Sequence, residues 1–174
     1  VLNGTPSVVF GLFGLAALVS WFHMGISLLA GIITLSLMVL PVVVRTTQEA
    51  VRQVDPELRE ASRALGATKA QTVFKVVLPA ALSGIVTGAV LSLGRAAGET
   101  APIMFTAVVV TQSRLGASIM DPVMALPYHL YYLASEGRAD PSLMYGTALV
   151  LLMIVLGLFA VATAVRIRGE RRLR

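Results

Sequence analysis

The sequence predicts an all-α fold, a polytopic bundle of transmembrane helices, and three observations support this prediction. Of the 174 residues, 56% are hydrophobic and 13% are charged, whereas soluble domains carry about 25% charged residues. Several apolar stretches are long enough to cross a bilayer, and most cationic residues lie between them. Backbone polar groups inside lipid need internal hydrogen-bond partners, so single segments that cross are helices. This composition argues against an ordinary soluble enzyme, and the lack of cysteine excludes disulfides and cysteine-ligated metal.

Four segments are predicted to cross the membrane. Two of them are uncharged over 19 and 23 residues, close to the roughly 20 residues that span the hydrocarbon core. The first segment is shorter, with Ser7 as its expected cap, but it ends in Trp21 and Phe22, which suit a membrane interface. The predicted crossings are residues 8–22, 26–44, 79–101 and 143–165.

The third crossing lies in a longer apolar stretch, from Leu78 to Val110, that contains Arg95 and Glu99. This stretch is too long for one straight crossing. Pro102 lacks the amide proton that would continue a helix, so we expect a bend at that point.

Cationic residues orient the crossings. Residues 45–78 carry six lysines and arginines and residues 166–174 carry five, whereas residues 111–142 carry two. By the positive-inside rule, residues 45–78 form a cytoplasmic loop and residues 166–174 a cytoplasmic tail, while residues 111–142 are external. The net charge of +5 is thus explained by topology, and no nucleic-acid partner is expected.

The cytoplasmic loop contains its own helix signals. Asp55 followed by Pro56 predicts a helix start, because a carboxylate caps the first amides and proline suits the first turn. Gly66 is suited to the left-handed residue that ends a helix. Thr68 and Gln71 then fit a capping box that opens a second helix. The loop is therefore predicted to be two helices joined by a glycine corner.

The first helix of the loop is predicted to have one apolar face. Leu58, Ala61 and Leu65 recur with helical spacing, and Arg59 and Arg63 lie one turn apart on another side. A solvated connector and a docking element for a soluble partner both fit this pattern. A DNA-binding helix-turn-helix does not, because the second helix continues into the membrane.

The same loop resembles the EAA loop of ABC-transporter permeases, although a serine replaces the second alanine of that motif. This resemblance implies an ABC type I importer permease-like fold whose loop helix docks on a cytoplasmic ATP-binding subunit. ATP would be bound by that subunit, because no Walker A loop occurs here; no cofactor and no catalytic residue are expected in this chain. The residues that carry the resemblance are Glu60, Ala61, Ser62, Gly66, Leu78 and Pro79.

Longer stretches are similar to phosphate permeases of the PstA type, over residues 4–16, 40–51, 78–107 and 124–135. The resemblance implies a single permease domain over residues 1–174, in a cell or inner membrane, with two N-terminal spans of the family absent from this sequence. It also implies three protein partners: the ATP-binding subunit, a second homologous permease, and a periplasmic or lipid-anchored phosphate-binding protein. The alternatives are a permease for sulfate or molybdate and a non-ABC channel or membrane anchor.

Arg95, Glu99 and Thr100 are the candidate substrate-path residues. Arg95 and Glu99 lie one helical turn apart in a membrane segment, where charges are costly and indicate function. One interpretation is that the two neutralise each other; the other is that Arg95 faces the path and attracts an oxyanion through its fork of donors. The matching GRxxGET pattern of phosphate permeases favours the second.

Three further groups of residues support more modest predictions. The small-residue pairs Gly84/Gly88 and Gly94/Gly98 predict close helix packing. The tyrosines at positions 128, 131 and 132 are expected in an external aromatic belt, or on a docking surface for the binding protein. His23 and His129 lack neighbouring ligands, so no metal site is expected.

Overall fold

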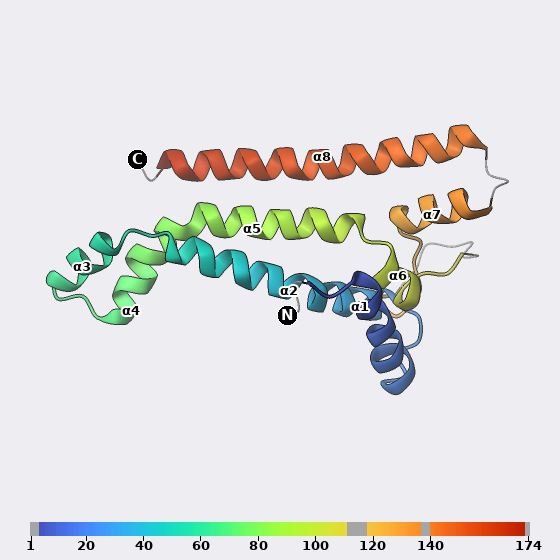
Figure 1. The fold of residues 1–174 in the computed structure, drawn as a ribbon, viewed down its shortest axis with the longest axis horizontal. Helices are drawn as coiled ribbons and strands as arrows, with labels where there is room; N and C mark the ends of the chain where they lie inside the picture. The colour runs from blue at the N-terminus through green and yellow to red at the C-terminus, as the bar shows by residue number, and fades with distance from the viewer. Residues whose placement is uncertain (1–3, 111–117, 137–139, 173–174) are drawn as a thin grey trace. The chain divides into compact units, whose positions relative to one another are not determined.

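A computed structural model describes residues 4–110, 118–136 and 140–172 of the chain, and these residues form helices (Figure 1). Within these residues no β-strand forms, and one isolated bridge pairs Val108 with Val123. The all-α prediction is confirmed. The elements are α1 (Ser7–Gly14), the π-helix η2 (Leu15–Trp21), α2 (Leu28–Arg52), α3 (Pro56–Ala64), α4 (Lys69–Thr72), the π-helix η3 (Val73–Val77), α5 (Leu78–Gly98), α6 (Ala101–Thr106), α7 (Leu126–Glu136) and α8 (Pro141–Arg172).

Three helical stretches are long and apolar enough to cross a membrane: residues 28–52, 69–98 and 141–161. They overlap most of the second, third and fourth predicted crossings, so this is a multi-pass membrane protein. Helices α2 and α8 extend beyond the predicted crossings into the predicted cytoplasmic loop and tail. The first predicted crossing corresponds to α1 and η2, which are too short to qualify by length. Its passage through the membrane stays a prediction.

By its internal contacts the chain forms two compact units, and the prediction of one domain over the whole chain stays a prediction. The first unit comprises residues 1–41 and 94–156, and the second comprises residues 42–93 and 157–174. The division falls inside α2, α5 and α8. The candidate residues near Arg95 belong to the first unit and the predicted coupling loop belongs to the second.

Close backbone approaches hold the first unit together. Helices α1 and α2 both lie against α6 through glycine. A Cβ atom added to Gly11 would lie 3.1 Å from Pro102 Cα, and one added to Gly31 would lie 2.6 Å from Ala107 Cβ. Only hydrogen fits at these positions, so the glycines set the spacing of the three helices. Ser7, the predicted cap, is instead the first residue of α1 and makes no capping hydrogen bond.

Part of the predicted external loop closes the start of α2. The amides of Leu28 and Leu29 donate to the carbonyls of Asp121 and Ile119, each at 2.9 Å. Ser27 caps the helix, because its Oγ accepts from the amide of Ala30 at 3.3 Å. The loop also contains α7 and the first residues of α8, while residues 111–117 and 137–139 lie outside the described part.

The second unit is built on the antiparallel contact of α2 with α5. A Cβ atom on Gly84 would lie 2.7 Å from Ala50 Cβ, and one on Gly88 would collide with Thr46. The packing predicted for this glycine pair is therefore confirmed. Gly98, from the second predicted pair, has no other described atom near its Cβ position within 4 Å. The core of the unit consists of Ala50, Val54, Val77 and Ala81.

Candidate functional site

The two predicted loop helices joined by a glycine corner are present, and residues 56–77 are here called the elbow. The first helix of the elbow is capped as the sequence indicates. Asp55 Oδ1 accepts a hydrogen bond from the amide of Glu57 at 2.9 Å, and Pro56 is the first residue of α3. Gly66 adopts a φ of +81°, the left-handed conformation that other residues adopt at a cost. The chain therefore turns sharply after α3, and this turn fixes the direction of the next helix.

The second helix of the elbow opens with the predicted capping box. The amide of Thr68 donates to Gln71 Oε1 at 2.8 Å, and the amide of Gln71 donates to Thr68 Oγ1 at 3.3 Å. From Lys69 the chain stays helical through α4 and η3 into α5, which begins at Leu78. The π-helical turn lies just before Pro79, where a proline ring disturbs regular α-helical bonding. The elbow and the membrane helix are thus one continuous rod.

The apolar face of α3 is not covered by any part of the chain that the structure describes. None of its residues is buried, and Leu58 and Leu65 are 49% and 88% exposed. Glu60 and Ala61 are also exposed. Ser62 differs, because its hydroxyl lies 3.0 Å from Thr72 Oγ1 of α4. The motif residues therefore divide into an outward pair and an inward serine.

Arg59 forms a contact that the sequence analysis missed. Its Nη2 donates to the carbonyl of Val51 at 2.6 Å, across the turn between α2 and α3. Arg63, predicted to share its side of the helix, is exposed, whereas Arg59 is half-buried. Sequence periodicity contains no signal for such a contact, because the acceptor is a backbone carbonyl whose position depends on the turn.

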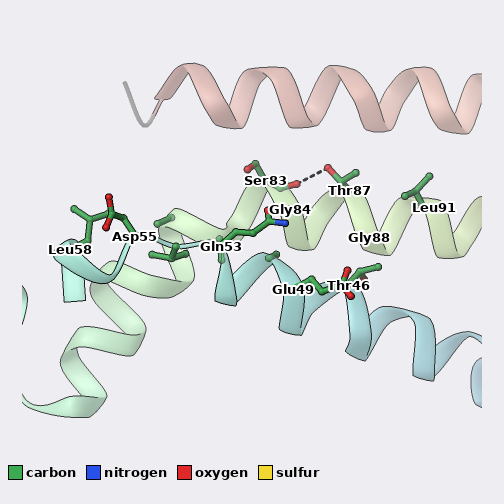
Figure 2. Close-up of a pocket in the computed structure, with 14 residues that line it drawn as sticks. Thr46, Glu49, Gln53, Asp55, Leu58, Ser83, Gly84, Thr87, Gly88 and Leu91 are labelled. Carbon is green, nitrogen blue, oxygen red and sulfur yellow. Dashed lines mark hydrogen bonds between the residues drawn. The ribbon is translucent and has the colours of Figure 1, made fainter. Parts of the chain in front are cut away.

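A groove of about 450 Å³ lies between α2 and α5 in the second unit (Figure 2). Two hydroxyls on its walls already donate to carbonyls of their own helices, Thr46 to Val42 at 3.0 Å and Thr87 to Ser83 at 2.7 Å. The charged side chains of the groove are the carboxylates of Glu49 and Asp55, which repel an anion. The lining residues are Thr46, Glu49, Ala50, Gln53, Val54, Asp55, Leu58, Ala80, Ala81, Ser83, Gly84, Thr87, Gly88 and Leu91.

Arg95 and Glu99 lie at the C-terminal end of α5 rather than in the middle of a helix. Helix α5 ends at Gly98, so Arg95 occupies its last turn and Glu99 the break that follows. The predicted bend is confirmed, but it falls at residues 99–100. Pro102 lies in the first turn of α6 and begins the next helix instead of interrupting α5.

The two charged side chains form a long ion pair. Arg95 Nε lies 3.4 Å from Glu99 Oε1, and the side chains are 44% and 16% exposed. The terminal guanidinium nitrogens of Arg95 make no hydrogen bond to any residue that the structure describes. Thr100 precedes α6 and its side chain caps nothing. The structure thus brings Arg95, Glu99 and Thr100 to one break in the helix, with donors of Arg95 still unused.

Helix α7 carries the aromatic residues that the sequence predicts for the external side. The rings of Tyr128 and Tyr131 lie 6.1 Å apart, and Tyr131 is 52% exposed.

At the start of α8, hydrogen bonds from the amide and hydroxyl of Ser142 hold the pKa of Asp140 below its ordinary value. Among the described residues no three potential metal ligands come together.

Comparisons with known proteins place the chain among membrane components of transport systems. Residues 1–172 match the family model of the binding-protein-dependent transport system inner membrane component. The phosphate transport system permease protein PstA 2 of Mycobacterium bovis is 36% identical over 99% of this chain and 58% of its own length. The permease protein PstA of Mycobacterium leprae is 39% identical over 99% of this chain and 57% of its own. The probable PstA of Methanocaldococcus jannaschii is 38% identical over 88% of this chain and 54% of its own. No solved structure matches.

The apolar helices and the capped elbow are those of a polytopic helical membrane protein. This chain belongs to the family of binding-protein-dependent transport system inner membrane components. It spans just over half the length of the curated relatives it matches.

Proposed function

We propose that this chain is the membrane-spanning part of an ATP-driven importer of inorganic phosphate, located in the cell membrane. Its relatives are named as phosphate transport system permeases. One observation carries the substrate assignment: Arg95 stands at a helix break with its terminal donors unused. A guanidinium fork matches phosphate oxygens in charge and geometry, whereas the groove between α2 and α5 lacks such donors.

Phosphate entry would begin at the outer end of α5. Arg95 binds the anion with the nitrogens that Glu99 leaves unused, and Thr100 offers a hydroxyl. Glu99 holds the guanidinium in place and limits how tightly the anion binds, because a carboxylate repels phosphate. A site that binds too tightly does not release its cargo, so this balance favours transport over storage.

Energy would enter through the elbow. The exposed face of α3, with Glu60 and Ala61, docks on an ATP-binding subunit, which holds and hydrolyses the ATP. Because the rod from Lys69 to Gly98 is continuous, motion at the elbow reaches the base of Arg95. A second permease subunit completes the path, and a phosphate-binding protein delivers the anion to the external side, where the tyrosines of α7 lie.

The test is uptake by the assembled complex. The chain, an ATP-binding subunit, a second permease and a binding protein are reconstituted in proteoliposomes, and ATP-dependent uptake of labelled phosphate is measured. We expect phosphate uptake that excess sulfate or molybdate does not inhibit. Uptake of sulfate or molybdate in place of phosphate would overturn the substrate assignment. Uptake of any anion without ATP or the ATP-binding subunit would instead identify a channel, and no uptake at all would favour an anchor.

A further inference from the structure

We propose that Arg59 is a positioning residue that makes α2 move together with the elbow. The inference rests on the proposed function, because it concerns how displacement of α3 reaches the membrane helices. All of the residues that carry it belong to one compact unit, the second.

The contact joins α3 to the end of α2. The last four carbonyls of an α-helix lack partners within the helix and carry its negative dipole end. Val51 lies in that last turn of α2, and its carbonyl accepts a short hydrogen bond of 2.6 Å from the Nη2 of Arg59 beside a long one of 3.4 Å from the amide of Val54. A cation placed there forms a charge-assisted hydrogen bond and also offsets the dipole. Both interactions would be lost if α3 separated from α2.

A second hydrogen bond joins α3 to the helix that follows it. Thr72 is buried, and its hydroxyl donates to the carbonyl of Thr68 at 3.2 Å. The hydroxyls of Ser62 and Thr72 lie 3.0 Å apart and share a hydrogen bond. Helix α3 is therefore attached on one side to α2 through Arg59 and on the other to the rod of α4 and α5 through Ser62.

The placement of Arg59 costs free energy, so the residue does more than make the helix surface soluble. Its Nε is buried and has no hydrogen-bond partner in the described chain, which is unfavourable for a charged donor. Arg63, one turn further along α3, is exposed and makes no hydrogen bond or ion pair with a described residue. Two arginines on one helix thus differ in role, and only Arg59 is anchored.

As a consequence, displacement of α3 moves two membrane helices, α2 and α5, together. Through the hydrogen bond of Ser62 alone, displacement of α3 moves the continuous helix formed by α4, η3 and α5, which contains Arg95. With Arg59 also engaged, the same displacement carries the inner end of α2. Within the second unit, displacement of α3 is therefore passed both to the end of α2 and to the start of α5.

The experiment compares three variants of the reconstituted complex: Arg59→Ala, Arg59→Lys and, as matched control, Arg63→Ala. Copurification of the ATP-binding subunit, ATP hydrolysis and phosphate uptake are measured for each. We expect Arg59→Ala to keep the subunit and most of its hydrolysis but to lose uptake about tenfold, the effect of one charged hydrogen bond. The ATP used per phosphate then rises. Lysine should restore part of the uptake because it also donates to a carbonyl, and Arg63→Ala should match the wild type.

Other results would overturn the proposal. If Arg59→Ala transports with unchanged ATP use, the contact transmits nothing. If both alanine variants lose the ATP-binding subunit equally, the arginines serve docking and not positioning. Hydrogen exchange provides a readout that needs no substrate: Arg59→Ala should speed exchange at the amides of residues 51–54 about tenfold, and unchanged exchange counts against the proposal. A wild-type complex that fails to import phosphate refutes the proposed function, but the exchange comparison still tests the contact.

Discussion

Two ion pairs in this chain have the same sequence pattern and different surroundings. Arg45 and Glu49, like Arg95 and Glu99, are an arginine and a glutamate one turn apart, joined from Nε to Oε1. The first pair is 2.8 Å long and more than half exposed on both sides, within the continuous helix α2. The second is 3.4 Å long, its glutamate is 16% exposed, and it straddles the end of α5.

The difference separates a surface pair from a candidate site. Where both partners belong to a regular helix, the fixed spacing allows close contact, and solvent makes the pair weak. Where the helix ends between the partners, the carboxylate turns inward and the guanidinium remains partly free. The same two residue types therefore neutralise each other in one place and leave donors for an anion in the other.

The largest expected effect comes from removing the cation of the second pair. Arg95→Ala should lower phosphate uptake about tenfold to a hundredfold, since two charged hydrogen bonds to the anion are lost. The matched change Arg45→Ala should lower it less than twofold, because an exposed pair contributes little. Uptake of labelled phosphate by proteoliposomes checks both variants, with copurification as the control for assembly. Equal effects at the two positions would abolish the distinction between the pairs.

A smaller effect is expected from Glu99→Gln, which keeps the shape of the side chain and removes its charge. Without the repulsion, Arg95 holds phosphate more tightly and releases it more slowly. We expect the KM and the maximal rate of uptake to fall together, each about threefold to tenfold, a change of about 1 kcal/mol in binding. The paired control is Glu49→Gln, which should change neither. A raised KM in Glu99→Gln would mean that the carboxylate aids binding.

The smallest effect is expected from removing the exposed pair entirely. The double variant Arg45→Gln with Glu49→Gln should change the free energy of unfolding by no more than about 1 kcal/mol, the upper end for surface pairs. Its thermal unfolding in detergent should therefore overlap with that of the wild type. A clear loss of stability would show that the pair supports the inner end of α2, and that exposure is a poor guide to its value.

The features predicted best from the sequence are those formed by near neighbours. The cap at Asp55, the left-handed Gly66 and the capping box of Thr68 and Gln71 involve residues two or three positions apart. Their geometry is fixed as soon as the helix starts. Asp140 before Pro141 repeats the signal of Asp55 before Pro56, so the start of α8 at Pro141 is also predictable from the sequence.

The features missed depend on the path of the chain. Arg59 finds the carbonyl of Val51 eight positions away across a turn, and no periodic pattern marks a backbone acceptor. The helix break was placed at Pro102 because proline ends helices, but proline also suits a first turn, and α6 starts around it.

The sequence by itself determined the membrane class and the positions of the elbow caps. These follow from composition and from local hydrogen bonding. Tertiary structure alone decided which arginines are engaged. Arg59 is anchored and Arg63 is free, and Arg45 is paired closely and Arg95 loosely, because a side chain's partners depend on where neighbouring helices end.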